Sequence, residues 1–285
     1  MVSADPELAR MSRLPPKVPV ILQSNQRSER PCLPVDPPLP PAGGWGVAEL
    51  HCHTTASDGV VRPEELVTIA EHLSLDVLAV TDHDTIDGAL RVRDHALATG
   101  ARVEVIVGME VTTRRQDHVV GLFLERAPRI FRSVPDTVDE IHAQGGLAVV
   151  AHPFLGLPSS ISPDRLRDAL QQCRFDGIEA ENPYMRKGAR DRLTEFLRDH
   201  SEGVGAQVGA SDAHFGDLAK AVTLFEGRGA ADLRRAVEER TTVPALGRVR
   251  HPRPSLHAHM QNQYRSLLRL PVMRAGTVWR QWREA

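Results

Sequence analysis

Short apolar runs alternate with longer amphipathic stretches through most of this chain, and this alternation constrains the fold more than any other feature. Each run has the length and the apolar content of a β-strand. The seven runs are Val47–Leu50, Val77–Val80, Val103–Val107, His118–Leu124, Leu147–Val150, Gly177–Ala180 and Val204–Ala210, with Ala221–Phe225 as a candidate eighth. Strands that alternate with helices pair in parallel through crossovers, which predicts an α/β sheet or barrel. Seven or eight such units over about 200 residues favour a closed barrel.

Helix signals separate these runs. A proline stands in the first turn of the first helix, where its missing N–H costs little, and glycines follow the ends of the second and third. The expected helices are Pro63–Leu73, Asp87–Ala98, Ser133–Gln144, a helix opened by Ser162-Pro163-Asp164, Gly188–His200 and Ala230–Arg240. The alternation therefore marks residues 47–248 as the main domain.

The two ends of the chain differ from this central part. Ten of the 21 prolines fall between Pro6 and Pro41, so residues 1–46 are predicted to form a flexible, disordered leader, with a proline-rich partner ligand as the alternative. Residues 249–285 form a basic amphipathic arm with seven arginines and one acid, Glu284. We expect the apolar side of the arm to pack on the barrel or on another subunit of a homo-oligomer. A membrane-surface or nucleic-acid role is the alternative.

Composition and local sequence exclude several classes of protein. No run of about 18 apolar residues occurs, so no membrane span is predicted. Asp5, Glu7 and Arg10 occupy the stretch in which a secretory signal needs an apolar core. The three cysteines match no zinc spacing and cannot all pair internally, which favours a reducing, cytoplasmic compartment. A net charge of −2 argues against strong nonspecific affinity for nucleic acid.

The thirteen histidines fall into separate populations. Three belong to the arm, and four lie within or at the ends of predicted helices and are interpreted as surface residues: His72, His95, His142 and His200. The other six lie at the ends of predicted strands: His51, His53, His83, His118, His152 and His214. The C-terminal ends of all strands in an α/β barrel converge on one face, so these residues become neighbours. His118 opens its run instead of following it, which leaves its place on that face open.

Three carboxylates occur at the same places: Asp58, Glu110 and Asp212. His51 and His53 are two residues apart on one strand, so both side chains point to the same side and can bind one metal ion. Imidazole and carboxylate together suit Zn²⁺, Mn²⁺ or Fe²⁺. Nine candidate ligands exceed what one ion can use, which predicts two or three divalent metal ions.

These residues form motifs in which the sequence resembles the polymerase and histidinol phosphatase (PHP) superfamily. The motifs are His51-Cys52-His53-Thr54 with Ser57-Asp58-Gly59, Thr81-Asp82-His83-Asp84, Glu110, His118, Ala151-His152-Pro153 and Ser211-Asp212-Ala213-His214. The resemblance covers about Val47 to Arg248 and implies a distorted (βα)7 barrel with a trinuclear site.

The same resemblance implies how the ligands divide among the metal ions. One ion would be held by His51, His53, Glu110 and Asp212. Asp58, His83 and His214 would hold a second, and Glu110 would bridge to a third ion bound by His118 and His152.

A site of this kind predicts a metal-dependent hydrolase. The preferred hypothesis is a phosphoesterase, either a phosphatase or a phosphodiesterase, that acts on a small phosphorylated substrate through a metal-bridging hydroxide. We expect His83, Asp58 and His214 to be the catalytic residues. The alternatives are an amide or carbamate hydrolase that uses the same site, and a noncatalytic, metal-stabilised binding module.

A loop after one predicted strand offers residues for the substrate. Asn182 and Arg186 are the expected substrate-binding residues, since a guanidinium can clamp a phosphate. Lys187 is a weaker candidate for the phosphate, and Tyr184 either lines the pocket or packs against the loop.

Overall fold

The computed structural model describes residues 44–284, so the predicted leader falls almost entirely outside the described residues. The fold is mixed α/β, with ten described strands in two five-stranded sheets. The first sheet contains, in spatial order, β10 (Val243–Leu246), β9 (Ala221–Glu226), β1 (Trp45–Glu49), β2 (Val77–Val80) and β3 (Glu104–Val107). The second contains β4 (Met109–Thr112), β5 (His118–Leu122), β6 (Leu147–Val150), β7 (Gly177–Glu181) and β8 (Ala206–Gly209).

The two sheets do not close into one continuously hydrogen-bonded barrel among the described residues, which corrects the expected (βα)7 barrel. Isolated bridges join them at two seams, between His83 and Glu110 and between Cys52 and Ala213. Strand β4 pairs antiparallel with β5, because the five residues between them are too few for a parallel crossover. Strand β5 also pairs antiparallel with β6. The sequence pattern missed β4 and β10.

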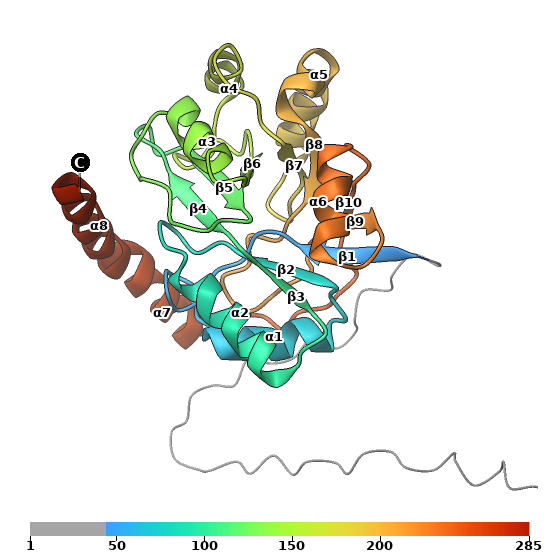
Figure 1. Ribbon diagram of the computed structural model, residues 1–285, viewed down its shortest axis with the longest axis vertical. Helices are drawn as coiled ribbons and strands as arrows, with labels where there is room; N and C mark the ends of the chain where they lie inside the picture. The colour runs from blue at the N-terminus through green and yellow to red at the C-terminus, as the bar shows by residue number, and fades with distance from the viewer. Residues whose placement is uncertain (1–43, 285) are drawn as a thin grey trace, which may run out of the picture. The chain divides into compact units, whose positions relative to one another are not determined.

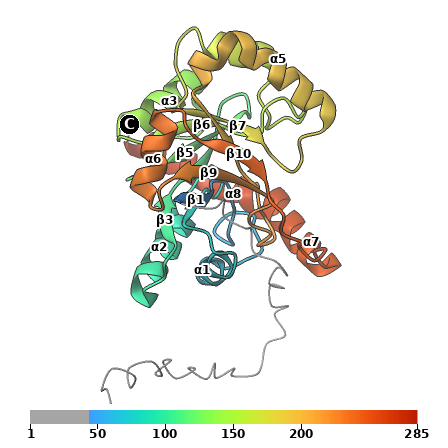
Figure 2. The ribbon, with the colours of Figure 1, turned by 90° about the vertical axis from the view of Figure 1, so that its right-hand side faces the viewer.

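Helices surround the strands in both views of the ribbon (Figures 1 and 2). The described helices of the main domain are α1 (Pro63–His72), α2 (Asp87–Thr99), α3 (Val134–His142), α4 (Pro163–Ala169), α5 (Lys187–Val204) and α6 (Ala230–Glu238). Ser133 and Ser162 cap α3 and α4 with their side chains, and Gly100 ends α2 in the left-handed conformation. The six predicted helices are therefore confirmed, with small shifts at their ends.

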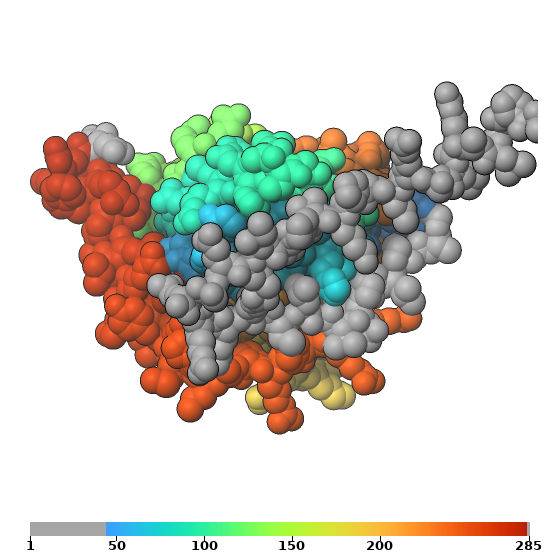
Figure 3. Space-filling model, turned by 90° about the horizontal axis from the view of Figure 1, so that it is seen from below, coloured from blue at the N-terminus to red at the C-terminus, as the bar shows by residue number. Residues whose placement is uncertain are grey.

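The arm is helical almost throughout. It consists of α7 (Leu256–Tyr264), the π-helical turn η2 (Arg265–Arg269) and α8 (Leu270–Glu284), and it runs along the outside of the domain (Figure 1). Seen from below, the arm forms an edge of the face in view (Figure 3). No helix among residues 44–284 has both the length and the apolar content needed to cross a membrane.

The arm contacts the domain with its polar side, which corrects the expectation that its apolar side packs there. Leu270 is its one large apolar side chain in the buried class. The exposed ones are Leu256, Met260, Tyr264, Leu267, Leu268, Val272, Val278, Trp279 and Trp282. Backbone carbonyls and a carboxylate of the domain face the arm, so arginine and asparagine side chains are the ones that bond to it.

Candidate metal centre

Six strands bring the nine predicted ligands together. His51 and His53 follow β1, His83 follows β2 and His152 follows β6. Glu110 lies in β4, His118 begins β5, and the remaining ligands Asp58, Asp212 and His214 lie in the turns after β1 and β8. Seven of the nine residues are at most 9% exposed, and the other two, Asp212 and His214, have side chains exposed by less than a fifth.

The place of His118 follows from the direction of its strand. Because β5 runs antiparallel to its two neighbours, its first residue lies beside their last residues. Thr112 at the end of β4 pairs with His118, and Val150 at the end of β6 pairs with Val119. A residue that opens this run therefore reaches the same face as those that follow the other strands.

Donor atoms of these residues gather in three groups, within each of which all lie within 4.8 Å of one another. The groups are His51, His53, Glu110 and Asp212; His53, Asp58, His83 and His214; and His83, Glu110 and His118. The first equals the set implied by the family resemblance, and the second adds His53 to the implied set. His152 is outside all three groups, although its Nε2 lies 2.9 Å from Glu110 Oε1.

Glu110 is the centre of the cluster. Its Oε1 lies 2.6 Å from His118 Nδ1, and its Oε2 lies 3.0 Å from His83 Nδ1. The Nε2 atoms of His51 and His53 are 3.2 and 3.4 Å from the same Oε2. One carboxylate thus touches a ligand of every group, which is what a bridge between metal ions requires.

Several donor atoms in the cluster are buried and lack any hydrogen-bond partner. They are His51 Nε2, His53 Nδ1, His83 Nδ1, His152 Nδ1 and Glu110 Oε2. Buried polar atoms are normally paired, since an unpaired one costs about 1–3 kcal/mol. The nitrogens of His51 and His83 approach Glu110 Oε2 without hydrogen-bond geometry. Imidazole nitrogens and carboxylate oxygens that converge in this way fit divalent cations such as Zn²⁺, Mn²⁺ or Fe²⁺.

Electrostatics separate the histidines of the cluster. Burial lowers the pKa of His83 to about 3, so its ring is neutral, as a metal ligand must be. Burial also opposes protonation of His214, but the carboxylates of Asp212 and Asp58 raise its pKa to about 10. The charge that raises this pKa is the same charge that would attract a cation.

Two buried carboxylates beside the cluster were missed by the sequence analysis. Glu179 Oε1 lies 2.6 Å from His51 Nδ1, and its Oε2 accepts the backbone N–H of His152 at 2.8 Å. Glu49 accepts hydrogen bonds from the backbone N–H groups of His51 and Ser211, and burial raises its pKa to about 7. A charged residue inside an otherwise apolar strand was the signal that could have revealed both, because such a residue needs buried partners.

The loop after β7 borders a cavity of about 830 Å³ that reaches His152 and Asp212. Arg186 and Tyr184 line this cavity. Asn182 does not, because its buried amide donates to Glu179 Oε2 at 3.1 Å and accepts the backbone N–H of Tyr184 at 2.9 Å.

Lys187 pairs with Asp191 and does not line this cavity either. Arg192, which the sequence analysis did not select, lines the cavity and donates to the carbonyl of Phe154 at 2.8 Å. Two guanidinium groups therefore lie beside the metal-ligand cluster.

The arm holds the two loops that carry Asp58 and His83. Asn262 Nδ2 donates to the carbonyl of Asp58 at 2.9 Å, and Arg265 donates to the carbonyl of Gly59 at 3.0 Å. Arg274 Nε donates to Asp84 Oδ2 at 2.6 Å. Nothing in the spacing of these residues indicates such contacts, since each one joins positions about 200 residues apart.

The profile of the PHP domain matches residues 49–243. An uncharacterized protein of Methanocaldococcus jannaschii, MJ1587, is 32% identical over 152 residues, which are 50% of this chain and 84% of that protein. The 5'-3' exoribonuclease of Haemophilus influenzae is 44% identical over 81 residues, or 27% of this chain and 29% of that enzyme. The second match therefore spans less than a third of either protein.

Comparison with solved structures supports the fold. A two-domain protein of Bacteroides vulgatus that contains a PHP-like metal-dependent phosphoesterase superposes with a TM-score of 0.60 at 19% identity. The superposition covers 74% of this chain and 68% of that one. At this identity the likeness concerns the fold alone.

Proposed function

Since this chain belongs to the PHP domain family, we propose that it is a metal-dependent phosphoesterase. The observation that carries the proposal is the set of five buried donor atoms without hydrogen-bond partners, all in one cluster. Two or three divalent ions, held by the eight residues of the three groups together with His152, would give these atoms partners. Such ions supply Lewis-acid chemistry, which acidifies water and neutralises charge on phosphoryl oxygens.

The residues around the cluster have separate roles in this proposal. Glu179 orients the ring of His51 through Nδ1, as a carboxylate behind a metal-binding imidazole does, and leaves Nε2 directed at Glu110 and Asp212. Asp58, His83 and His214 surround the part of the cluster beside the arm, where we place the catalytic residues.

Arg186 is the residue that we propose to bind the substrate phosphate. It lies at the N-cap of α5 and lines the cavity that contains Asp212 and His152. A guanidinium binds phosphate through two hydrogen bonds, and the positive end of the helix dipole adds to the attraction. Asn182 instead supports the site by holding Glu179 in place.

Activity on a panel of chromogenic substrates tests this function. The metal-loaded protein should hydrolyse p-nitrophenyl phosphate or bis-p-nitrophenyl phosphate and leave acyl esters and carbamates intact. Hydrolysis of acyl substrates alone would establish an amide or carbamate hydrolase. No turnover by protein that binds metal would indicate a binding module.

Arg186→Ala tests the substrate residue. Loss of a charged hydrogen bond to phosphate should raise KM by about tenfold or more with little change in kcat. Arg198→Ala, on the same helix but outside the cavity, is the matched control and should behave as the parent does. Equal kinetics for the two variants would remove Arg186 from the site.

A further inference from the structure

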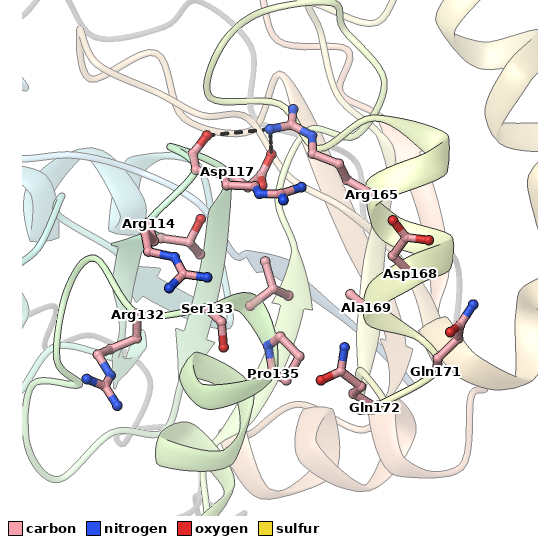
Figure 4. A pocket seen from close by; sticks show the side chains of 13 residues that line it. Arg114, Asp117, Arg132, Ser133, Pro135, Arg165, Asp168, Ala169, Gln171 and Gln172 are labelled. Carbon is pink, nitrogen blue, oxygen red and sulfur yellow. Dashed lines mark hydrogen bonds and ion pairs between the residues drawn. The ribbon is translucent and has the colours of Figure 1, made fainter.

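A second cavity, of about 400 Å³, lies outside the metal-ligand cluster. It is bordered by the turn between β4 and β5, the start of α3 and one side of α4, and none of the nine proposed metal ligands lines it (Figure 4). Four arginines do: Arg114, Arg115, Arg132 and Arg165. Cavities of this size hold small organic ligands.

The positive charge of this cavity is only partly neutralised within the protein. Arg165 Nη1 lies 2.8 Å from Asp117 Oδ1, and the two side chains face each other across the upper part of the cavity (Figure 4). Arg132 approaches Asp136 only to 3.9 Å. The side chains of Arg114 and Arg115 make no hydrogen bond or ion pair within residues 44–284.

A buried hydroxyl supplies a second, independent indication of a ligand. Thr113 lines the cavity and is 1% exposed, yet its Oγ1 has no hydrogen-bond partner. A hydroxyl left in this state costs about 1–3 kcal/mol, which a bound acceptor would recover. The first turn of α3, with Ser133 as its cap, adds the positive end of a nine-residue helix to the same wall.

We propose that this cavity binds a small organic phosphomonoester. Guanidinium groups of Arg114 and Arg132 bind the phosphate, because their planar forks match phosphate oxygens. The hydroxyl of Thr113 donates to an oxygen of the same ligand. Val134, Pro135 and Ala169 give an apolar surface for its organic part, and the amide of Gln172 offers both a donor and an acceptor.

The proposed site is separate from the metal centre but adjoins it in the chain. Residues 113–117 connect the strand of Glu110 to His118, and Asp117 directly precedes His118. The proposal rests on this cavity alone, so it stands or falls independently of the phosphoesterase activity.

Calorimetric titration of the metal-loaded protein with phenylphosphonate tests the proposal. Phenylphosphonate mimics a phosphomonoester and has no ester bond to hydrolyse. The parent should bind two equivalents, one at each site, whereas benzyl alcohol, which lacks the dianion, should not bind. Arg114→Ala with Arg132→Ala should weaken one of the two binding events by about tenfold or more.

Two further variants keep the result interpretable. Arg126→Ala removes an exposed arginine that lies outside the cavity and should retain both binding events. Thr113→Val keeps the shape of the side chain and loses no hydrogen bond within the described protein, so it should weaken the same event several-fold without lowering Tm. No binding by the parent, or binding that the double variant leaves unweakened in every event, would overturn the proposal.

Discussion

The metal-ligand cluster and the C-terminal arm place their polar side chains in different surroundings. In the cluster, imidazoles and carboxylates are buried against one another, and several donor atoms have no partner. In the arm, polar side chains bond to the domain, while nine large apolar side chains are exposed. The cluster lacks partners for its polar atoms, and the arm lacks partners for its apolar surface.

Each region therefore lacks partners of a different kind. The unpaired, buried imidazole nitrogens and carboxylate oxygen of the cluster are suited to bind cations. The exposed leucine and tryptophan side chains along the arm are suited to pack against another apolar surface. A second copy of this chain that pairs through the arm remains our proposal for that surface.

The largest expected effect comes from removal of a cluster histidine. His83→Ala and His152→Ala should each reduce kcat/KM by about a thousandfold or more, because a ligand of the metal ions is lost. His95→Ala, at a partly exposed position of α2, should stay within a few-fold of the parent. Steady-state kinetics with metal analysis of each variant would show whether loss of activity accompanies loss of bound metal. A folded His95→Ala variant that is equally inactive would contradict the division of the histidines into ligands and surface residues.

Truncation after Arg250 should have the next largest effect. It removes the hydrogen bonds of Asn262, Arg265 and Arg274 to the domain and exposes the contacts of Leu270. At about 1 kcal/mol for each hydrogen bond, Tm should fall by roughly 5–10 °C. If arms pair between copies, gel filtration should also show a smaller species, whereas an unchanged Tm and elution volume would show that the arm is not part of the folded unit.

Arg274 links the arm to the loop that carries His83. Arg274→Gln leaves the carboxylate of Asp84 with only its bonds to Thr112, so the loop of His83 should loosen and metal affinity should fall several-fold. Arg280→Gln, in the same helix and bonded only to Thr277 within it, is the matched control. Competition with a chelator measures both, and equal affinities would limit the arm to a structural role.

The smallest effect concerns a histidine outside both regions. A hydrogen bond to Asp176 raises the pKa of His142 above its usual value of 6.5. The pair therefore stabilises the fold below that value, and this stabilisation is lost as pH rises through the raised pKa. His142→Gln should lower Tm by about one to two degrees near pH 5.5 and by less near pH 8.5, and a loss that grows with pH would contradict the assignment.

Much of the fold followed from local signals, and the misses have physical causes. Caps, prolines and a terminal glycine marked four of the six helices of the domain, α1 to α4, because these signals act within one turn. The antiparallel pairing of β4, β5 and β6 depended on the length of a turn, which the alternation of runs does not report. The closed barrel was expected because the alternation of strands and helices was taken to mean parallel pairing throughout. The described strands form two sheets instead.

The ligand residues could be selected because histidines at strand ends stand out against apolar runs. Glu179 and Glu49 were missed because a single carboxylate in a strand looks like an exposed residue until the other face is known to be buried. Asn182 was selected for a loop position, but its amide is used inside the protein. Contacts of the arm depend on tertiary structure alone.

The two seams between the sheets give the proposed metal ions a mechanical consequence. Each seam has a single isolated bridge, and both bridges lie beside proposed ligands. An ion shared by His51 after β1 and Asp212 after β8 would act as a cross-link that closes a loop of about 160 residues. Metal loading would then govern how readily the two sheets separate, so unfolding of the loaded protein should be slow and should quicken when a chelator captures the released ions.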